Sequence, residues 1–167
     1  INARNQAGSS ALYAVAAKGN IDVAELLVAK GADLSLLAND GTTPLHAAAA
    51  GGHLPLIEFL LTKHMAIDAR DKAGESALHK AVSMRQMKAI ELLVNRGADI
   101  NAQTDQGWGP LHIAVSTGQV PVAELLLKRG ANVNARLKNG NTPLKLTTGS
   151  YSRQSPMASL LEQYGAQ

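Results

Sequence analysis

Apolar and polar positions repeat along the chain with a period of 33 residues. A glycine opens each period, at Gly8, Gly41, Gly74, Gly107 and Gly140. A short block rich in alanine and leucine follows each glycine. A second, more apolar block comes after it, centred on Leu26-Leu27-Val28, Phe59-Leu60-Leu61, Leu92-Leu93-Val94, Leu125-Leu126-Leu127 and Leu160-Leu161. This spacing predicts that each period forms two helices joined by a turn.

The residues that flank the two blocks predict where the helices begin and end. Thr43-Pro44 and Thr142-Pro143 place a capping hydroxyl before a proline that suits the first helical position. Glycines follow most of the predicted helices, at Gly19, Gly52 and Gly118 after the first helix and at Gly31, Gly97 and Gly130 after the second. Glycine is favoured there because a helix commonly ends in a left-handed residue. Arg85 and His64 depart from this pattern, since they stand where other repeats have glycine.

The five periods resemble the ankyrin-repeat family. The segments GSSALYAVAAKGN, GTTPLHAAAAGGH, GESALHKAVSMRQ, GWGPLHIAVSTGQ and GNTPLKLTTGSYS are similar to its pattern G-x-T-P-L-H-x-A-A-x-x-G-H. The resemblance implies an all-α solenoid of stacked helix–turn–helix units, with turn or β-hairpin fingers between them. It implies one domain over 1–167, with repeats at about 5–37, 38–70, 71–103, 104–136 and 137–167. The fifth repeat carries a two-residue insertion, because its leucine pair comes two residues late.

Composition narrows the picture further. The chain has 167 residues, is 46% hydrophobic and only 3% aromatic, so alanine, leucine, isoleucine and valine must build its core. There is no cysteine, which excludes disulfides and thiolate chemistry. No apolar run is long enough to predict a transmembrane helix. No export leader precedes Ile1, but Ile1-Asn2-Ala3 aligns with the exit loop Ile100-Asn101-Ala102, so we expect sequence upstream.

Three histidines, His46, His79 and His112, recur at the repeat period and raise the question of a metal site. Stacked repeats would hold them about 10 Å apart, which is too far for a single ion. The family resemblance instead implies that each imidazole supports its turn through hydrogen bonds. We therefore expect no metal, no cofactor and no catalytic residues. For His64 we keep two interpretations open, a locally altered loop or a partner contact that is sensitive to pH.

The resemblance also implies that a partner binds to the finger tips and to the inner, concave face of the first helices. Trp108 directly follows a finger glycine, and we expect it to be exposed and to act as a binding anchor; packing against a neighbouring finger is the alternative. The residues predicted to bind a partner are Trp108, Asp105, Gln106, Met84, Arg85, Lys72, Glu75, Asn39, Asp40 and Thr42. Leu36-Leu37 and Leu137 are apolar residues at finger positions and are interpreted as finger-to-finger packing.

Charge adds one feature to this surface. The net charge is +3, and six basic residues with no acidic residue lie between Lys128 and Arg153, namely Lys128, Arg129, Arg136, Lys138, Lys145 and Arg153. Such a segment is able to steer an acidic partner. Binding to DNA is less well supported, because neither a recognition helix nor interleaved aromatic residues accompany the charge.

These observations predict a non-catalytic protein–protein interaction module rather than an enzyme. Its finer role has two interpretations. One is an inhibitor or self-protection protein that occludes a bacterial hydrolase, for which we favour export to the periplasm over the cytoplasm. The other is a scaffold or adaptor domain of a larger cytoplasmic protein. In both cases we expect a monomer whose partner is another protein, with no nucleic acid and no membrane insertion.

Overall fold

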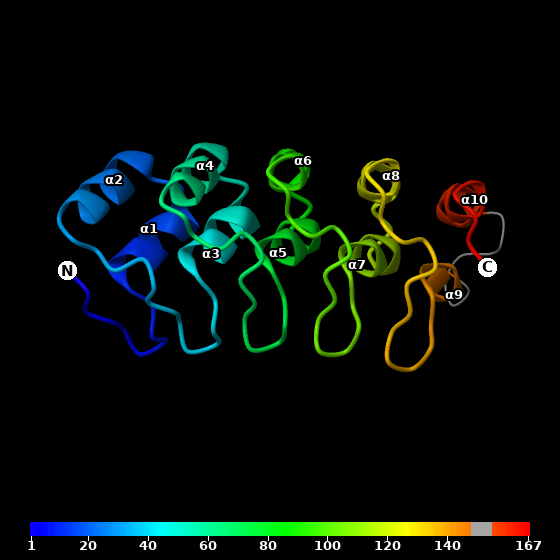
Figure 1. Cartoon of the computed structure of the whole chain (residues 1–167), viewed down its shortest axis with the longest axis horizontal. Coiled ribbons are helices and arrows are strands. Elements are labelled where there is room, and N and C mark those ends of the chain that lie inside the picture. Colours follow the sequence, from blue (N-terminus) through cyan, green and yellow to red (C-terminus); the bar gives the residue numbers. More distant parts are fainter. Residues whose placement is uncertain (148–154) are drawn as a thin grey trace. The chain divides into compact units, whose positions relative to one another are not determined.

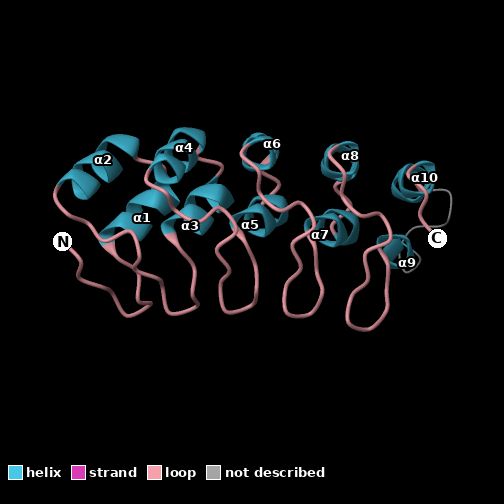
Figure 2. Ribbon diagram, in the orientation of Figure 1, coloured by secondary structure: helices cyan, strands magenta, loops and turns pink. Residues whose placement is uncertain are grey.

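The computed structural model describes residues 1–147 and 155–167, and the regular elements in these residues are helices (Figures 1 and 2). No strand forms in this part of the chain, although Arg4 and Ser10 make one isolated antiparallel bridge. The helices are α1 (Ala11–Lys18), α2 (Ile21–Ala29), α3 (Pro44–Gly51), α4 (Leu54–Thr62), α5 (Ala77–Ser83), α6 (Met87–Asn95), α7 (Pro110–Ser116), α8 (Val120–Lys128), α9 (Pro143–Leu146) and α10 (Pro156–Gln163). The pairs of helices predicted from the repeat are thus confirmed.

The chain divides into two compact units, Ile1–Ala98 with α1 to α6 and Asp99–Gln167 with α7 to α10. The boundary falls in the third expected repeat, 71–103, directly after its second helix. The two-residue insertion expected in the fifth repeat belongs to the stretch between α9 and α10. Most of that stretch, including Arg153 of the basic segment, lies outside the described residues.

Thr43 and Thr142 stand at the N-cap positions of α3 and α9, as predicted, but the Thr142 hydroxyl makes no capping hydrogen bond. The hydroxyl of Ser10 accepts the backbone N–H of Tyr13 at 3.2 Å, and that of Thr43 accepts the N–H of His46 at 3.3 Å. Pro44 then takes the first helical position, where its missing N–H is not needed. Gly109 stands at the equivalent cap of α7 and has no side chain to offer, so this helix lacks the hydroxyl cap.

In the first unit, α1, α3 and α5 pack side by side, and α2, α4 and α6 form a second row, above them in Figure 1. Ala48 and Ala49 on α3 are completely buried, and their small side chains allow the neighbouring helices to approach closely. Leucines from both rows fill the interior, including Leu45, Leu60 and Leu78. Each fully buried leucine contributes about 2 kcal/mol of transfer free energy, so the aliphatic core predicted from composition stabilises the unit.

In the second unit, α7 contacts α8 and α9, while α10 contacts both α8 and α9. Its core follows the same chemistry, with Ala114, Ala123 and Ala158 completely buried beside Leu126 and Leu161. The alanine positions again set a short distance between helices. Across the described residues, no helix is both long and apolar enough to cross a membrane.

A loop that we call a finger precedes each first helix and projects away from the helix rows (Figure 2). Each finger closes on a tight turn, as in the bonds from Gly41 N to the Ala38 carbonyl at 2.9 Å and from Gly107 N to the Thr104 carbonyl at 2.9 Å. Within each unit, backbone hydrogen bonds join neighbouring fingers. They run from Asn39 N to the Ala7 carbonyl (2.8 Å), from Lys72 N to the Asp40 carbonyl (2.9 Å) and from Lys138 N to the Gln106 carbonyl (3.1 Å).

Side chains also connect consecutive repeats. The Nε2 atom of His53 lies 3.1 Å from the Ala17 carbonyl at the end of α1, and the amide of Gln86 donates to the Ala50 carbonyl at the end of α3 at 3.1 Å. The last carbonyls of a helix have no partner inside it, and these bonds satisfy two of them. The repeats of the first unit are therefore joined at their helix ends as well as at their fingers.

Candidate functional site

Two finger glycines, Gly107 and Gly41, combine a left-handed backbone conformation with a lack of space for a side chain. Gly107 has a φ of +85°, and a Cβ atom added there would lie 3.0 Å from the Leu137 Cα and 3.0 Å from the Lys138 nitrogen. Gly41 has a φ of +83°, and a Cβ atom added there would lie 2.9 Å from the backbone nitrogen of Lys72. A side chain is thus excluded at these positions, and the fingers of each unit approach one another through bare backbone.

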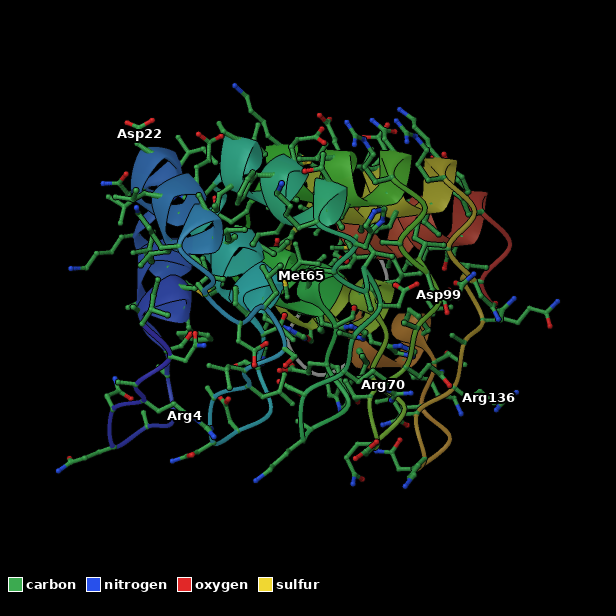
Figure 3. The ribbon with its side chains drawn as sticks, turned by 60° about the vertical axis from the view of Figure 1, so that its left-hand side comes forward. Arg4, Asp22, Met65, Arg70, Asp99 and Arg136 are labelled. Carbon is green, nitrogen blue, oxygen red and sulfur yellow. The ribbon has the colours of Figure 1, made fainter. Side chains whose placement is uncertain are left out.

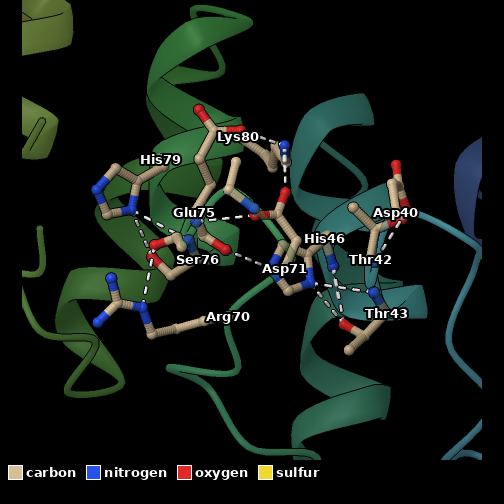
Figure 4. Close-up of polar contacts among 12 residues, drawn as sticks. Asp40, Thr42, Thr43, His46, Arg70, Asp71, Glu75, Ser76, His79 and Lys80 are labelled. Atoms are coloured by element: carbon tan, nitrogen blue, oxygen red, sulfur yellow. Dashed lines mark hydrogen bonds and ion pairs between the residues drawn. The ribbon is translucent and has the colours of Figure 1, made fainter. Parts of the chain in front are cut away.

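The recurring histidines lie at the base of the fingers. His46 Nδ1 accepts the backbone N–H of Thr43 at 3.2 Å, and its Nε2 lies 2.9 Å from the carbonyl oxygen of Glu75 on the next finger (Figure 4). Because Nδ1 faces a donor and Nε2 faces an acceptor, the ring is held as the neutral Nε2–H tautomer. Burial lowers the pKa of His46, although the Glu75 carbonyl opposes this effect.

The other two histidines share the Nδ1 contact with the backbone at the start of their helix. His79 Nδ1 accepts the N–H of Ser76 at 3.1 Å, and His112 Nδ1 accepts the N–H of Gly109 at 3.2 Å while its Nε2 lies 3.1 Å from the Ala135 carbonyl. Burial also lowers the pKa of His112. The predicted hydrogen-bonding role of the histidines is therefore confirmed. In the described part of the chain, no cluster of three histidine, cysteine or carboxylate side chains is arranged to hold a metal ion.

The second finger places its predicted contact residues in different environments. Asn39 and Asp40 are exposed, and the amide of Asn39 donates to the Gln6 carbonyl at 2.9 Å. Thr42 differs from the expectation of a surface contact, since it is only 4% exposed. Its hydroxyl donates to the Asp40 carboxylate at 2.6 Å and is hydrogen-bonded to the Tyr13 hydroxyl at 3.1 Å. Thr42 thus supports the finger from inside, and its bonds lower the pKa of Asp40.

The third finger carries an ion cluster that the sequence analysis missed. Lys80 on α5 lies 2.7 Å from a carboxylate oxygen of Asp71 and also pairs with Glu75 (Figure 4). Asp71 accepts two backbone N–H groups of its own finger, from Ala73 and Glu75, both at 2.9 Å. Burial disfavours the charged forms of Asp71 and Lys80, but their hydrogen bonds and opposite charges outweigh this effect. The pKa of Asp71 is therefore lowered and that of Lys80 is raised.

This cluster changes the interpretation of Glu75, which was predicted as a partner contact. Its carboxylate is engaged within the protein, whereas Lys72 on the same finger is exposed. A signal for Lys80 was present in the sequence. It stands in a column otherwise occupied by Ala14, Ala47, Ile113 and Leu146, so a charge at this position needs a partner.

The end of α5 exposes the two predicted residues Met84 and Arg85. Met84 is 58% exposed, and Arg85 has a φ of +59° in the left-handed region. His64 also adopts this conformation, with a φ of +61°. Both residues thus keep the backbone conformation of the glycine that they replace. His64 lines a surface hollow with the apolar side chains of Leu34, Leu37 and Met65.

Trp108 is half-buried rather than exposed. Its ring makes an edge contact with His112, with centroids 6.2 Å apart and planes at 69°. Its backbone is bonded on both sides, since its N–H donates to the Thr104 hydroxyl at 3.1 Å and its carbonyl accepts the Thr104 N–H at 2.8 Å. The indole therefore combines the two expected roles, because it packs inside the second unit and still reaches the surface.

A surface hollow lies beside Trp108, between the fourth and fifth fingers. Trp108, Gln106, Leu137, Lys138 and Asn139 line this hollow, which we call the finger hollow. Leu137 is buried, as expected for finger-to-finger packing. Gln106 and Asp105 are both exposed, but Asp105 does not line the hollow. Of the predicted contacts in this unit, the structure thus brings Trp108 and Gln106 together.

Comparison with known proteins agrees with the repeat architecture. The family model described as ankyrin repeats (3 copies) matches residues 11–104, 52–137 and 97–167, which together extend over almost the whole chain. A search of curated proteins finds no match.

Proposed function

Because the chain belongs to the ankyrin-repeat family, whose members are non-catalytic protein-binding modules, we propose that it holds a partner protein on its finger tips and first helices, with Trp108 as an anchor. The observation that carries this proposal is the half-buried indole in the finger hollow. The residue after a finger glycine stands one position before the N-cap of the first helix, so it caps no helix. An indole there adds a large apolar surface that a partner is able to cover.

The backbone around Trp108 supports this role. Both of its main-chain groups are hydrogen-bonded to Thr104, and the neighbouring fingers are bonded to each other. A partner that docks on such a surface orders few additional groups, so little of the contact free energy is lost to entropy.

For the finer role, we favour an inhibitor or self-protection protein that occludes a bacterial hydrolase. A stiff surface blocks an active-site mouth by steric exclusion and needs no chemistry of its own. A scaffold or adaptor would use the same surface and leave the activity of its partner unchanged. Adding the purified protein to its identified partner separates the two roles: a fall in the partner's turnover favours the inhibitor, and unchanged turnover favours the scaffold.

The test of the binding surface is a pair of alanine variants. The partner is first captured from the native host and identified, and Kd values are then measured by calorimetry. We expect Trp108→Ala to weaken binding by about 2 kcal/mol or more. Tyr164→Ala is the matched control, because Tyr164 is a 38% exposed aromatic residue of the same unit, at the end of α10. Partner binding by folded Trp108→Ala that is as tight as that of the wild type would overturn the proposal.

A further inference from the structure

The finger hollow has the chemistry of a mixed apolar and cationic binding site. Trp108 and Leu137 supply its apolar surface, Lys138 supplies a positive charge, and Gln106 and Asn139 supply amide groups. We propose, resting on the function proposed above, that the partner inserts an acidic peptide segment here, with one large apolar side chain flanked by aspartate or glutamate.

The hollow is held open by the backbone. The close approach of Gly107 to the Leu137 backbone fixes the distance between the fourth and fifth fingers. Two hydrogen bonds maintain it, from Lys138 N to the Gln106 carbonyl at 3.1 Å and from the Gln103 amide to the Arg136 carbonyl at 3.2 Å. A partner side chain thus meets a preformed site, which lowers the cost of binding.

Arg136 provides a second positive charge on the fifth finger. Its counterparts in the repeat, Arg4 and Arg70, each turn back and donate through Nε to a carbonyl of their own finger, at 2.7 Å to Gly8 and 3.2 Å to Gly74. Arg136 lies on the fifth finger (Figure 3), and its guanidinium makes no such bond and no ion pair with any residue that the structure describes. An arginine that does not brace its finger is available to a carboxylate.

No acidic residue close to the fifth finger in the sequence offsets the positive charges of Arg136 and Lys138. No aspartate or glutamate occurs from Leu125 to Leu161. Glu124, which comes just before this stretch, is paired with Lys128. Lys138 is exposed and, like Arg136, has no ion pair among the described residues. The fifth finger therefore attracts negative charge next to an apolar hollow.

A peptide fits this combination better than a nucleic acid. Backbones of nucleic acids are bound by a row of cations that contact successive phosphates. Here one cation, Lys138, lines a single apolar hollow, and a second, Arg136, stands on the same finger. The amides of Gln106 and Asn139 lie where they are able to bond a peptide main chain. The apolar side chain gives affinity, and the carboxylates give selectivity.

Trp108 is the only tryptophan of the chain, so its fluorescence reports directly on the hollow. The probes are three synthetic peptides with a central phenylalanine or alanine: one flanked by glutamates, its glutamine analogue, and the glutamate peptide with alanine at the centre. We expect the glutamate–phenylalanine peptide to shift the Trp108 emission and to bind at least tenfold more tightly than the other two. Its affinity should fall as salt is added.

Charge reversal tests the residues involved. The double variant Arg136→Glu with Lys138→Glu should lose the preference for the glutamate peptide. The control, Lys18→Glu with Lys30→Glu, changes the net charge equally at exposed lysines outside the hollow and should keep that preference. Circular dichroism verifies that both variants are folded.

The remaining outcomes separate this inference from the proposed function. If Trp108→Ala weakens partner binding but glutamate and glutamine peptides bind equally, the acidic-segment inference is wrong and the proposed function stands. If Trp108→Ala has no effect on the partner, the proposed function itself fails. Tighter binding of a single-stranded oligonucleotide than of the glutamate peptide overturns the inference in favour of a nucleic acid.

Discussion

The Nε2 atom of His46 lies 2.9 Å from the carbonyl oxygen of Glu75, so the start of α3 is tied to the finger of the following repeat. The Nε2 atom of His112 lies 3.1 Å from the Ala135 carbonyl, in the segment that leads into the fifth finger. In each ring Nδ1 also accepts a backbone N–H, and this second bond requires the neutral imidazole.

This geometry predicts a loss of stability at mildly acidic pH. Burial lowers the pKa of His46 and His112 in the folded protein, whereas the unfolded chain takes up protons near the ordinary histidine pKa of about 6.5. The unfolded state therefore binds more protons below that pH. The stabilisation by the neutral rings is complete above it and declines as the pH falls through it. The charges of Asp71, Asp40 and Lys80 also act on His46, but burial dominates.

Urea unfolding at about pH 7 and about pH 5 measures the effect, with the lower midpoint expected in acid. Proton NMR provides a direct check, since the ring signals of His46 and His112 should titrate below the ordinary histidine range. A titration midpoint at or above that range for both rings would contradict the prediction. The variant His46→Asn lacks one titrating ring, so its stability should vary less with pH than that of the wild type.

A methyl group at Gly107 should be far more costly than one at Gly130. Both glycines have a positive φ, +85° and +91°, so alanine at either position costs about 1–2 kcal/mol in backbone strain. Only Gly107 faces the backbone of the next finger, while nothing lies within 4 Å of a Cβ at Gly130. We expect Gly107→Ala to lower the free energy of unfolding by at least about 1 kcal/mol more than Gly130→Ala does. Equal losses in urea unfolding would mean that the close approach of the fingers contributes nothing.

Arg85→Gly should stabilise the protein. Arg85 holds a φ of +59° that glycine adopts without strain, and relief of this strain outweighs the added freedom of the unfolded chain. We expect a gain of about 0.5–1 kcal/mol in the free energy of unfolding. Gly118 is the matched control, because it occupies the same repeat position with a φ of +69° and open space around it. Gly118→Ala should shift the thermal midpoint downwards, opposite to the shift of Arg85→Gly.

Lys80→Met should destabilise the third finger. The carboxylate side chain of Asp71 is only 4% exposed, and removal of Lys80 leaves this charge with backbone partners alone. The expected cost is about 1–3 kcal/mol, the range for charged hydrogen bonds. Lys128→Met breaks the exposed pair with Glu124 and should cost no more than about 0.5 kcal/mol. If the two variants are equally stable, the pairing of Lys80 with Asp71 contributes no more to the free energy of unfolding than an exposed ion pair does.

Features set by neighbours in the sequence could be predicted well. The cap of Thr43 and the bond of its N–H to His46 Nδ1 join residues three positions apart, and the left-handed Arg85 follows from its place in the repeat. Short-range rules and a 33-residue period are sufficient for such features.

Features that depend on the distance between fingers could not be predicted. Thr42 is buried because Tyr13 of the preceding repeat reaches its hydroxyl, and Trp108 is half-buried because His112 and the fifth finger pack near it. Lys80 finds its partners on a finger whose turn brings Asp71 under α5. These contacts depend on loop geometry to within an ångström, which no periodicity encodes.

Main-chain hydrogen bonds join neighbouring fingers, as between Lys138 N and the Gln106 carbonyl. They form whatever side chains stand at the tips, provided that the residue that donates its N–H is not proline. Mutation at the tips is therefore uncoupled from the spacing of the repeats. A lineage that carries this scaffold is able to exchange Gln106, Lys138 or Asn139 one at a time and acquire a new partner without passing through an unfolded intermediate.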